Sequence, residues 1–434
     1  MQIILTVIIL FFLTACSSIH TVEYANIKQL SSLPQYASAY TKHMQNSDAL
    51  YATQQNYKTS YFSAWSKNTK HATLYDIKWP FRNYTIFNSY GANLKPIKLS
   101  WFYHQYANAN FPDFASVDKF AITLKYSSLH NFPTDNPIFY KPTLAGEGFP
   151  FDYNQNSGID ADKPVFVSFY SRDGAWAYVF SSFASGWINI SNIAFISKKD
   201  IKTYQSSKFV HILQDSYPIK DNNNTFICYS RIGMMLPLVA SSKQDWTVSV
   251  ALKDCNGSVV FKDAVIPRYI GTIKTLTFTR HNIDMVSDAI MHSKYGWGGI
   301  NGGRDCSAFV RDFYAPFGIW LPRNSALQAK VGKIISLRHL LDTDKIKMIK
   351  AKGIPFQTLL YMRGHILIYA GIYHNRVIAL QEMWGIGIKK GKKTGRVIIG
   401  HAAYTTLDIG HRLKYYNAKK SILHKIISMN IITN

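Results

Sequence analysis

The sequence contains few cysteines and few acidic residues. Only four cysteines occur among 434 residues, which excludes a disulfide-dense scaffold and leaves too few thiols for several cysteine-rich zinc sites. Aspartate and glutamate number 25 against 49 lysines and arginines, so the formal net charge is +24. Such an excess suits an anionic partner, which can be nucleic acid, a membrane surface or an anionic polymer. No long basic block typical of nucleic-acid-binding arms is present, so a solvated lysine-rich surface is the simpler interpretation.

Charged residues make up 17% of the chain, whereas hydrophobic residues make up 47%, which excludes intrinsic disorder as an overall description. The length predicts two to four domains. No histidine has metal-ligand spacing to a carboxylate or thiol partner, and the glycine run at 298–303 lacks a P-loop lysine. We therefore expect neither a metal nor another cofactor.

The N-terminus carries an apolar run over residues 1–15 that is too short for a comfortable transmembrane helix but has the length of a signal-peptide core. Leu13-Thr14-Ala15-Cys16 resembles a bacterial lipobox, in which Cys16 becomes the lipidated first residue. Because Ser17 follows, the resemblance implies, in a Gram-negative host, an outer-membrane lipoprotein that faces the periplasm. A buried N-terminal helix with an incidental cysteine is the alternative. Export also makes nucleic acid an improbable partner.

The chain after the signal divides into four further parts. Residues 16–115 read as a polar tether followed by an aromatic-rich, mostly helical segment that packs on its neighbours. Short apolar strands with turn signals, among them Asp173-Gly174, predict two small β-barrels at 116–198 and 199–270. Cys228 and Cys255 both fall in the second barrel, where a disulfide and two buried free thiols are about equally expected. Residues 271–434 form the last part.

Cys306 stands where a glycine-rich approach gives way to a helix, whose apolar face begins at Phe309. A free thiol, with a pKa of about 8.5, is mostly protonated at neutral pH. The start of a helix offers partial positive charge and unpaired N–H donors, so we expect it to favour the thiolate. Asp305 can cap the same helix. A buried structural cysteine is the alternative without this context.

A cysteine nucleophile needs a base and a group that orients the base. His365 begins an apolar strand, and a second strand, ending in Gln381, follows the turn residues His374-Asn375. In the resulting hairpin, a loop of odd length places Gln381 on the face of His365, whereas a strict two-residue turn places Glu382 there. The sequence leaves both registers open.

Several motifs in the last part resemble the NlpC-type family of papain-like cell-wall cysteine peptidases. They are Tyr295-Gly-Trp-Gly-Gly299, Arg304-Asp-Cys-Ser307, Leu321-Pro-Arg-Asn-Ser325, Gly364-His365 and Met383-Trp384-Gly385. Weaker motifs before them resemble two bacterial SH3-type domains: Phe151-Asp-Tyr153, Ser171-Arg-Asp-Gly-Ala-Trp176, Gly186-Trp-Ile188 and Arg231-Ile-Gly-Met-Met-Leu-Pro237. The family version with an N-terminal helical clip and two SH3-type domains covers nearly the whole chain. This resemblance implies an α+β papain-like domain, preceded by two all-β SH3-like barrels and a mostly helical segment.

The resemblance implies that Cys306 is the nucleophile, His365 the base and Gln381 the third polar residue. Histidine is common at that third position, so Gln381 is a departure, and Glu382 remains a competitor. An amide oxygen can nevertheless accept the imidazole N–H and fix the tautomer. The implied substrate-binding residues are Tyr295, Asp305 and Ser307. Tyr295 can orient Cys306 or polarise the substrate carbonyl, and Asp305 either binds a free ammonium or only caps the helix.

The implied substrate is the peptidoglycan stem peptide, cut between γ-D-glutamate and diaminopimelate or lysine, and preferably with a free N-terminal L-alanine. A catalytically inactive wall-binding or scaffolding lipoprotein is the alternative from a different class. A papain-like amidase or acyl transferase is a third possibility, and a basic peripheral membrane protein a weaker fourth. We expect a monomer. The lysine-rich stretch after Tyr416 suggests no function.

Overall fold

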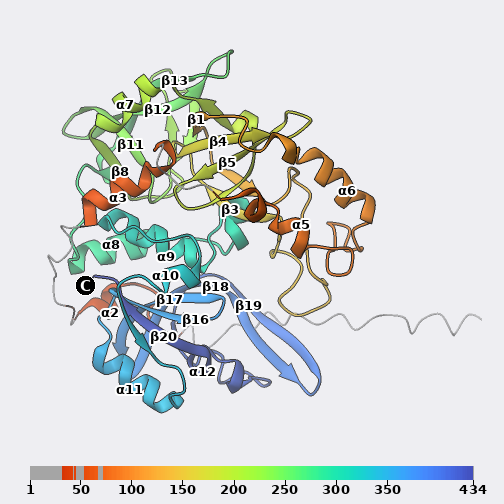
Figure 1. Cartoon of the computed structure of the whole chain (residues 1–434). Coiled ribbons are helices and arrows are strands. Elements are labelled where there is room, and N and C mark those ends of the chain that lie inside the picture. The colour runs from red at the N-terminus through yellow and green to blue at the C-terminus, as the bar shows by residue number, and fades with distance from the viewer. Residues whose placement is uncertain (1–31, 43, 45–52, 67–71, 434) are drawn as a thin grey trace, which may run out of the picture.

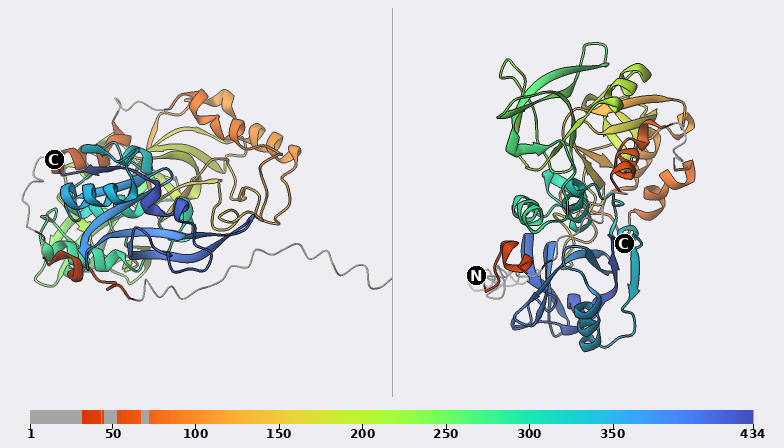
Figure 2. Two further views of the ribbon diagram at one scale, coloured as in Figure 1. Left: turned by 90° about the horizontal axis from the view of Figure 1, so that it is seen from below. Right: turned by 90° about the vertical axis from the view of Figure 1, so that its left-hand side faces the viewer.

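A half that contains two β-barrels with several helices and an α+β half meet along two helices, α8 (Arg280–Ile290) and α9 (Cys306–Tyr314). The computed structural model describes residues 32–42, 44, 53–66 and 72–433. Figure 2 shows the two halves as separate lobes, the barrels in one and the sheet of residues 333–431 in the other. The predicted papain-like α+β domain behind two SH3-like barrels is confirmed, and the segment before them, predicted to be mostly helical, is partly helical.

The first barrel is a seven-stranded sheet in the order β3-β2-β6-β5-β4-β1-β7. Its strands are β1 (Lys119–Thr123), β2 (Ser127–His130), β3 (Gln155–Ile159), β4 (Pro164–Tyr170), β5 (Trp176–Ser181), β6 (Ser185–Asn189) and β7 (Ile193–Phe195). The Asp-Gly hairpin is where the sequence predicts it, because Tyr170 pairs with Ala177 across it. Asp173 closes this turn by accepting the backbone N–H of Ala175 at 3.0 Å.

The second barrel follows helix α7 (Lys198–Ser206) and has the strand order β13-β12-β11-β8-β14. Its strands are β8 (Phe209–Ile212), β11 (Met235–Ser241), β12 (Asp245–Lys253), β13 (Val259–Pro267) and β14 (Gly271–Thr272), with β9 (Pro218–Lys220) and β10 (Phe226–Tyr229) as a separate pair. Cys228 is buried and Cys255 is exposed, and both are free thiols. The disulfide alternative is therefore wrong, and so is the expectation that Cys255 is buried.

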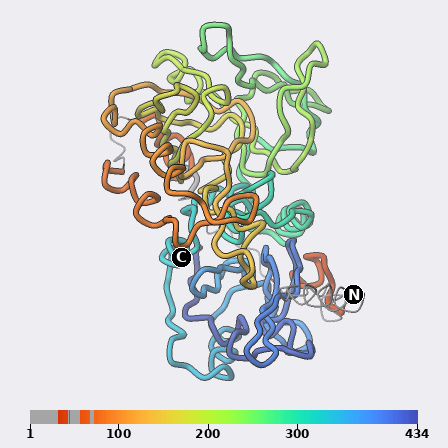
Figure 3. Tube along the Cα trace, turned by 90° about the vertical axis from the view of Figure 1, so that its right-hand side faces the viewer, coloured from red at the N-terminus to blue at the C-terminus, as the bar shows by residue number. Residues whose placement is uncertain are grey.

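The N-terminal segment contacts all three domains (Figure 3). Its helices are α2 (Ser38–Thr41), α3 (Thr53–Tyr61), α4 (Leu74–Ile77), α5 (Trp79–Asn83) and α6 (Leu99–Asn108). Tyr40 stacks on Tyr404 of the α+β domain with ring centroids 4.6 Å apart. Tyr61 and Trp65 pack in a cluster that includes Ile122 and Met235 of the two barrels. Some of the aromatic residues of this segment thus serve as core, whereas others, among them Phe87 and Tyr103, are exposed.

The α+β domain has a six-stranded sheet in the order β15-β20-β16-β17-β18-β19. Its remaining elements are α10 (Ser325–Gln328), β15 (Lys333–Ser336), α11 (Asp342–Lys352), β16 (Thr358–Met362), β17 (His365–Tyr373), β18 (Arg376–Lys390), β19 (Lys393–Thr406), α12 (Ile422–Lys425) and β20 (Ile426–Ile431). Phe309 and Phe313, one helical turn apart, bury the apolar face of α9 in one cluster with Ile366 and Ile368 of β17. This packing brings the first turn of α9 beside the first residues of β17.

The lysine-rich C-terminal stretch is part of this domain. It ends in β20, which pairs with both β15 and β16 inside the sheet. No helix in the described ranges is long and apolar enough to cross a membrane.

Candidate active site

A β-bulge decides which side chain meets His365. The β17–β18 hairpin turns through only two residues, His374 and Asn375, both with positive φ (44° and 60°). Tyr373 pairs with Arg376 across this turn, and that register alone would place Glu382 on the His365 face. The register then shifts by one residue between Tyr369 and Gly371, and beyond the shift Ile368 pairs with Leu380. The shift turns Gln381 to the His365 face.

His365 and Gln381 form a hydrogen bond of 2.7 Å between Nε2 of the ring and the amide Oε1. The Gln381 amide nitrogen donates to Thr405 Oγ1, so the amide oxygen is the atom left for His365. An amide oxygen only accepts hydrogen bonds, so Nε2 carries a proton and Nδ1 of a neutral ring is a free base. Gln381 is fully buried, and burial lowers the pKa of His365, so the neutral ring is favoured.

Glu382 points away from His365. Its carboxyl accepts the hydroxyl of Ser293, and its other oxygen is buried without a hydrogen-bond partner among the described residues. Burial raises the pKa of Glu382 to about 8. Of the two competing residues, Gln381 is therefore the one in contact with His365.

Cys306 is the first residue of α9, and Asp305 caps this helix, as predicted, by accepting the Ala308 N–H at 2.8 Å. The backbone N–H groups of Ser307 and Ile366 lie within hydrogen-bonding reach of the sulfur and lower its pKa. Burial and the negative charge of Asp305 nevertheless raise the pKa of Cys306 to about 12. The helix start thus favours the thiolate, as expected, but it does not decide the net pKa. Burial outweighs the N–H donors, and the capping carboxylate opposes the helix dipole.

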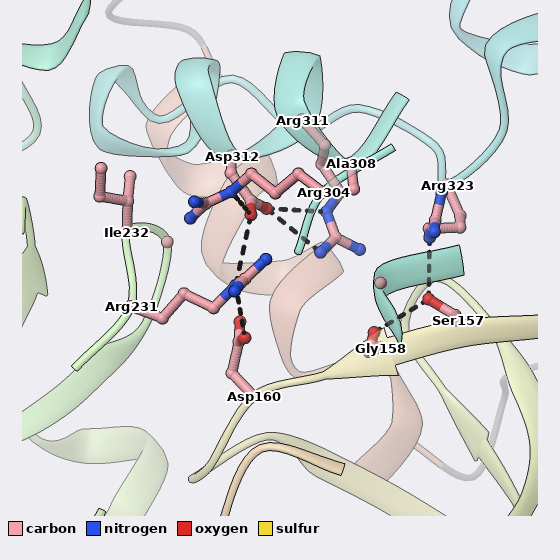
Figure 4. Close-up of polar contacts among 12 residues, drawn as sticks. Ser157, Gly158, Asp160, Arg231, Ile232, Arg304, Ala308, Arg311, Asp312 and Arg323 are labelled. Atoms are coloured by element: carbon pink, nitrogen blue, oxygen red, sulfur yellow. Dashed lines mark hydrogen bonds and ion pairs between the residues drawn. The ribbon is translucent and has the colours of Figure 1, made fainter. Parts of the chain in front are cut away.

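Asp305, Ser307 and Arg323 form one hydrogen-bonded group beside Cys306. Arg323 donates to Asp305 Oδ2 at 2.7 Å and to Ser307 Oγ at 3.0 Å, and Ser307 donates to Asp305 Oδ1 at 3.0 Å. Arg323 also donates to Ser157 of β3 at 2.8 Å (Figure 4). Despite burial, the Arg323 guanidinium and the N–H donors hold the pKa of Asp305 below its usual range, so Asp305 is ionised. The first barrel thus supports the residues next to the thiol.

The loop before Cys306 is held by buried ion pairs that reach both barrels (Figure 4). Arg304, 1% exposed, donates to Asp312 of α9 at 2.8 Å and to Asp215 of the second barrel at 2.9 Å. Arg231 of the second barrel donates to the Gly302 carbonyl at 2.6 Å and pairs with Asp160 of the first barrel at 3.2 Å. Removing one partner from a buried pair is costly, typically about 3–5 kcal/mol. The position of the Cys306 loop therefore depends on all three domains.

Two glycines let the first barrel approach this loop. Gly298 and Gly299 have φ of 57° and 88°, and their carbonyls accept hydrogen bonds from Gln155 (3.1 Å) and Tyr126. A Cβ at 298 would lie 2.7 Å from the Gln155 carbonyl oxygen, and one at 299 would lie 2.9 Å from the Gly158 nitrogen. The glycine-rich approach is therefore required both by backbone conformation and by the contact with β3.

A cleft of about 800 Å³ opens between the first barrel and the α+β domain. Five of the predicted site residues line it: Tyr295, Asp305, Cys306, Ser307 and His365. Gln381 lies behind His365. The first barrel contributes Phe151, Tyr153 and Gln155 to the opposite wall, and residues of β18, β19 and α12 line much of the rest. Trp79 and Tyr84 of the N-terminal segment also line the cleft.

Tyr295 lies in this cleft between two other aromatic rings. Its centroid is 5.7 Å from that of Trp384 and 6.2 Å from that of Phe151. Burial, with the nearby Cys306 as the next cause, raises its pKa well above the usual value, so its hydroxyl remains a donor. A donor here can polarise a carbonyl group bound in the cleft.

Several residues of the site were not assigned a role from the sequence. Arg323 belongs to the Leu321-Pro-Arg-Asn-Ser325 motif, but the sequence analysis predicted no role for it. No sequence pattern indicated a role for Thr405 or for the ion-pair partners Asp215 and Asp160. Thr405 occupies an inward position of β19, a pattern that predicts burial but not its hydrogen bond to Gln381. Among the described residues, no group of three or more histidine, cysteine or acidic side chains could hold a metal ion.

Comparison with known proteins agrees with this architecture. The NlpC/P60 family model matches residues 292–390, and the N-terminal NLPC_P60 stabilising domain matches residues 3–114. SH3 domain models of the SH3b1 and SH3b2 types match residues 137–189 and 197–243. No curated protein matches the chain.

Among solved structures, a novel NlpC/P60 endopeptidase from Photobacterium damselae subsp. piscicida is similar, with a TM-score of 0.81 and 22% identity over 93% of this chain and 98% of that one. An NlpC/P60 family protein from Bacillus cereus ATCC 10987 has a TM-score of 0.49 and 14% identity over 73% of this chain and 100% of that one. The first likeness establishes a shared fold, and the second adds nothing to it. The family models supply the family: the chain is a member of the NlpC/P60 family of cell-wall cysteine endopeptidases, with the N-terminal stabilising domain and two SH3-type domains of that family.

Proposed function

We propose that the chain cleaves stem peptides of peptidoglycan at the bond between γ-D-glutamate and the diamino acid. The observation that carries the proposal is the position of Cys306. It lines a cleft next to His365, whose other ring nitrogen is held by Gln381. A thiol, an oriented imidazole and a cleft that admits a peptide are the parts that acyl transfer to sulfur requires.

The reaction begins with a neutral thiol and a neutral imidazole. Nδ1 of His365 takes the thiol proton as sulfur attacks the γ-carbonyl carbon, and the carbonyl π electrons move to oxygen. The Tyr295 hydroxyl and backbone N–H groups at the start of α9 stabilise that oxyanion. The imidazolium then protonates the amine of the diamino acid as the C–N bond breaks, which leaves a thioester on Cys306. Water, deprotonated by His365, hydrolyses the thioester and regenerates the thiol.

A free N-terminal L-alanine on the substrate forms part of the proposal. Asp305 supports it, because it lines the cleft one residue from Cys306 and is ionised. Arg323 neutralises much of this charge, so the polar side chains of the first barrel share in binding the ammonium. This preference directs the activity to released stems rather than to intact glycan strands.

The test uses the chain from Ser17 onward and a Cys306→Ala variant, each mixed with stem tetrapeptides carrying a free L-alanine and either diamino acid. Mass spectrometry detects L-alanyl-D-glutamate. Release by the parent alone supports the proposal. Release by both identifies a different nucleophile, and release by neither under reducing conditions favours the wall-binding alternative.

We also propose that the protein is exported and anchored through lipid on Cys16, in the outer membrane and facing the periplasm, and that it is a monomer. Residues 1–31 lie outside the described residues, so the lipobox motif alone supports the anchor. In a Gram-negative host, the parent should incorporate labelled fatty acid and fractionate with the outer membrane. A Cys16→Ser variant should do neither, and equal labelling of both chains would exclude the anchor.

A further inference from the structure

Three basic side chains on the wall of the cleft form no ion pair with an acidic group of the described residues. They are Arg396 on β19, Lys420 at the end of the 3-10 turn Ala418–Lys420, and Lys425 at the end of α12, and all three line the cleft. Asp305 and Arg323, the other permanently charged residues of its lining, form an ion pair with each other. Within the described part of the chain, no acidic side chain lies within 4.0 Å of any of the three cations.

The three cations lie near enough to affect one another. Burial, followed by the positive charges of Lys420 and Arg396, lowers the pKa of Lys425. Such mutual repulsion costs free energy in the empty protein and is relieved when an anion binds between the cations. The cluster therefore has the electrostatics of an anion site.

Arg396 is the most buried of the three. Its Nε is inaccessible and has no hydrogen-bond partner among the described residues, which is costly for a guanidinium. The guanidinium packs against Gly146 in the loop between β2 and β3, and a Cβ at position 146 would have no room. Glu147 is the nearest acid to influence Arg396, but its carboxylate accepts the Tyr153 hydroxyl at 2.9 Å. Arg396 is thus held by packing, and no group among the described residues accepts a hydrogen bond from its guanidinium.

The leaving half of the proposed substrate carries the matching charge. A stem peptide that contains diaminopimelate has a carboxylate at its C-terminus and a second one at the end of the diamino acid side chain. Lysine-containing stems lack the second. The three cations are on β19 and the C-terminal segment. Asp305, which is assigned above to the free amino group of the substrate, lies at the start of α9 beside the first barrel. The two ends of the substrate are thus assigned to different parts of the cleft.

We propose that Arg396, Lys420 and Lys425 form a carboxylate-binding subsite for the diamino acid side of the scissile bond, and that the subsite selects diaminopimelate over lysine. The inference rests on the proposed function, since it assigns the leaving half of that substrate to this wall of the cleft. Charge-assisted hydrogen bonds from a guanidinium and two ammonium groups suit two carboxylates.

The test compares the parent with the triple variant Arg396→Gln, Lys420→Gln, Lys425→Gln on stem tetrapeptides that differ only in diaminopimelate or lysine. A matched variant, Lys198→Gln, Lys199→Gln, Lys202→Gln, removes the same charge from α7, which does not line the cleft. We expect KM for the diaminopimelate stem to rise about tenfold in the first variant, with kcat little changed. KM for the lysine stem should change less, and the α7 variant should resemble the parent.

Equal KM values in parent and cleft variant, or equal effects of the two triple variants, would overturn the subsite while leaving the proposed cleavage intact. Cleavage of neither stem by the parent would refute the proposed function instead. The subsite is then decided by calorimetric titration of the dipeptide diaminopimelyl-D-alanine. Binding that weakens about tenfold in the cleft variant alone supports it, and binding unaffected by the substitutions excludes it.

Discussion

Replacing Gln381 by leucine tests the orientation of the catalytic base. The substitution removes the 2.7 Å bond to His365 Nε2 and leaves that N–H and the Thr405 hydroxyl without their partner in a fully buried place. A neutral hydrogen bond contributes about 1 kcal/mol, and an unsatisfied buried group costs about 1–3 kcal/mol. The imidazole then samples other tautomers and orientations. We expect kcat/KM to fall about 10- to 100-fold, at about 1.4 kcal/mol per factor of ten, with KM nearly unchanged.

Two control variants separate orientation from packing. Gln381→Glu keeps an acceptor for the ring N–H but adds a negative charge, which stabilises imidazolium and moves the acid limb of the kcat/KM profile to higher pH. Glu382→Gln should change activity little, because Glu382 contacts Ser293 and not His365. Parent-like activity of Gln381→Leu, or a loss of more than tenfold in Glu382→Gln, would refute the assignment. Circular dichroism and unfolding curves show whether each variant is folded.

Three further results are expected. Burial raises the pKa of Glu382 to about 8. Its contribution to the free energy of unfolding is therefore complete below about pH 4.5 and is lost as the pH rises towards 8. Urea unfolding of the parent at pH 5 and pH 8 should show this loss, and Glu382→Gln should not. Because Cys306 and His365 rest as neutral groups, the rate of Cys306 alkylation by iodoacetamide should stay low at pH 5–7 and rise above pH 8. A high, constant rate from pH 5 upward would indicate a thiolate–imidazolium pair instead. Asp312→Ala should lower the unfolding free energy by about 3–5 kcal/mol, because it removes one of the two carboxylates that bind buried Arg304 and the acidic partner of Arg311. Asp344→Ala, in an exposed pair, should change it by less than about 1 kcal/mol.

Local signals predicted the elements that carry the site. The apolar spacing after Cys306 and the capping type of Asp305 predicted a helix that begins at the thiol, because caps and helix faces depend on residues a few positions apart. The Asp-Gly turn and the barrel strands were predicted for the same reason. Because side chains alternate between the two faces of a strand, the hairpin left two candidates for the residue beside His365, which are Gln381 and Glu382. The bulge that decides between them depends on sheet packing around Gly371, which periodicity does not reveal.

Long-range electrostatics could not be predicted in the same way. The partner of Arg304 lies 89 residues earlier in the chain, and nothing near Asp215 in sequence indicates it. The helix start lowers the pKa of Cys306 as expected, but burial, the largest effect on this pKa and the one that raises it, is a property of the assembled domains. The lysines of the C-terminal stretch indicate an exposed segment without a function. The apolar residues of β20 in the same stretch are more informative, because they predict a buried strand.

The arrangement gives the two SH3-type domains a part in placing Cys306, the nucleophile of the proposed mechanism. Asp215 and Asp160 hold the arginines that fix the Cys306 loop, and Ser157 holds the arginine that neutralises Asp305. These contacts are buried or largely buried. A shift of either barrel would therefore leave charged side chains unpaired away from water, which is costly. Cys306 is therefore placed by contacts that exist only when the three domains are packed together, and the proposed mechanism requires that packing as well as Cys306 and His365.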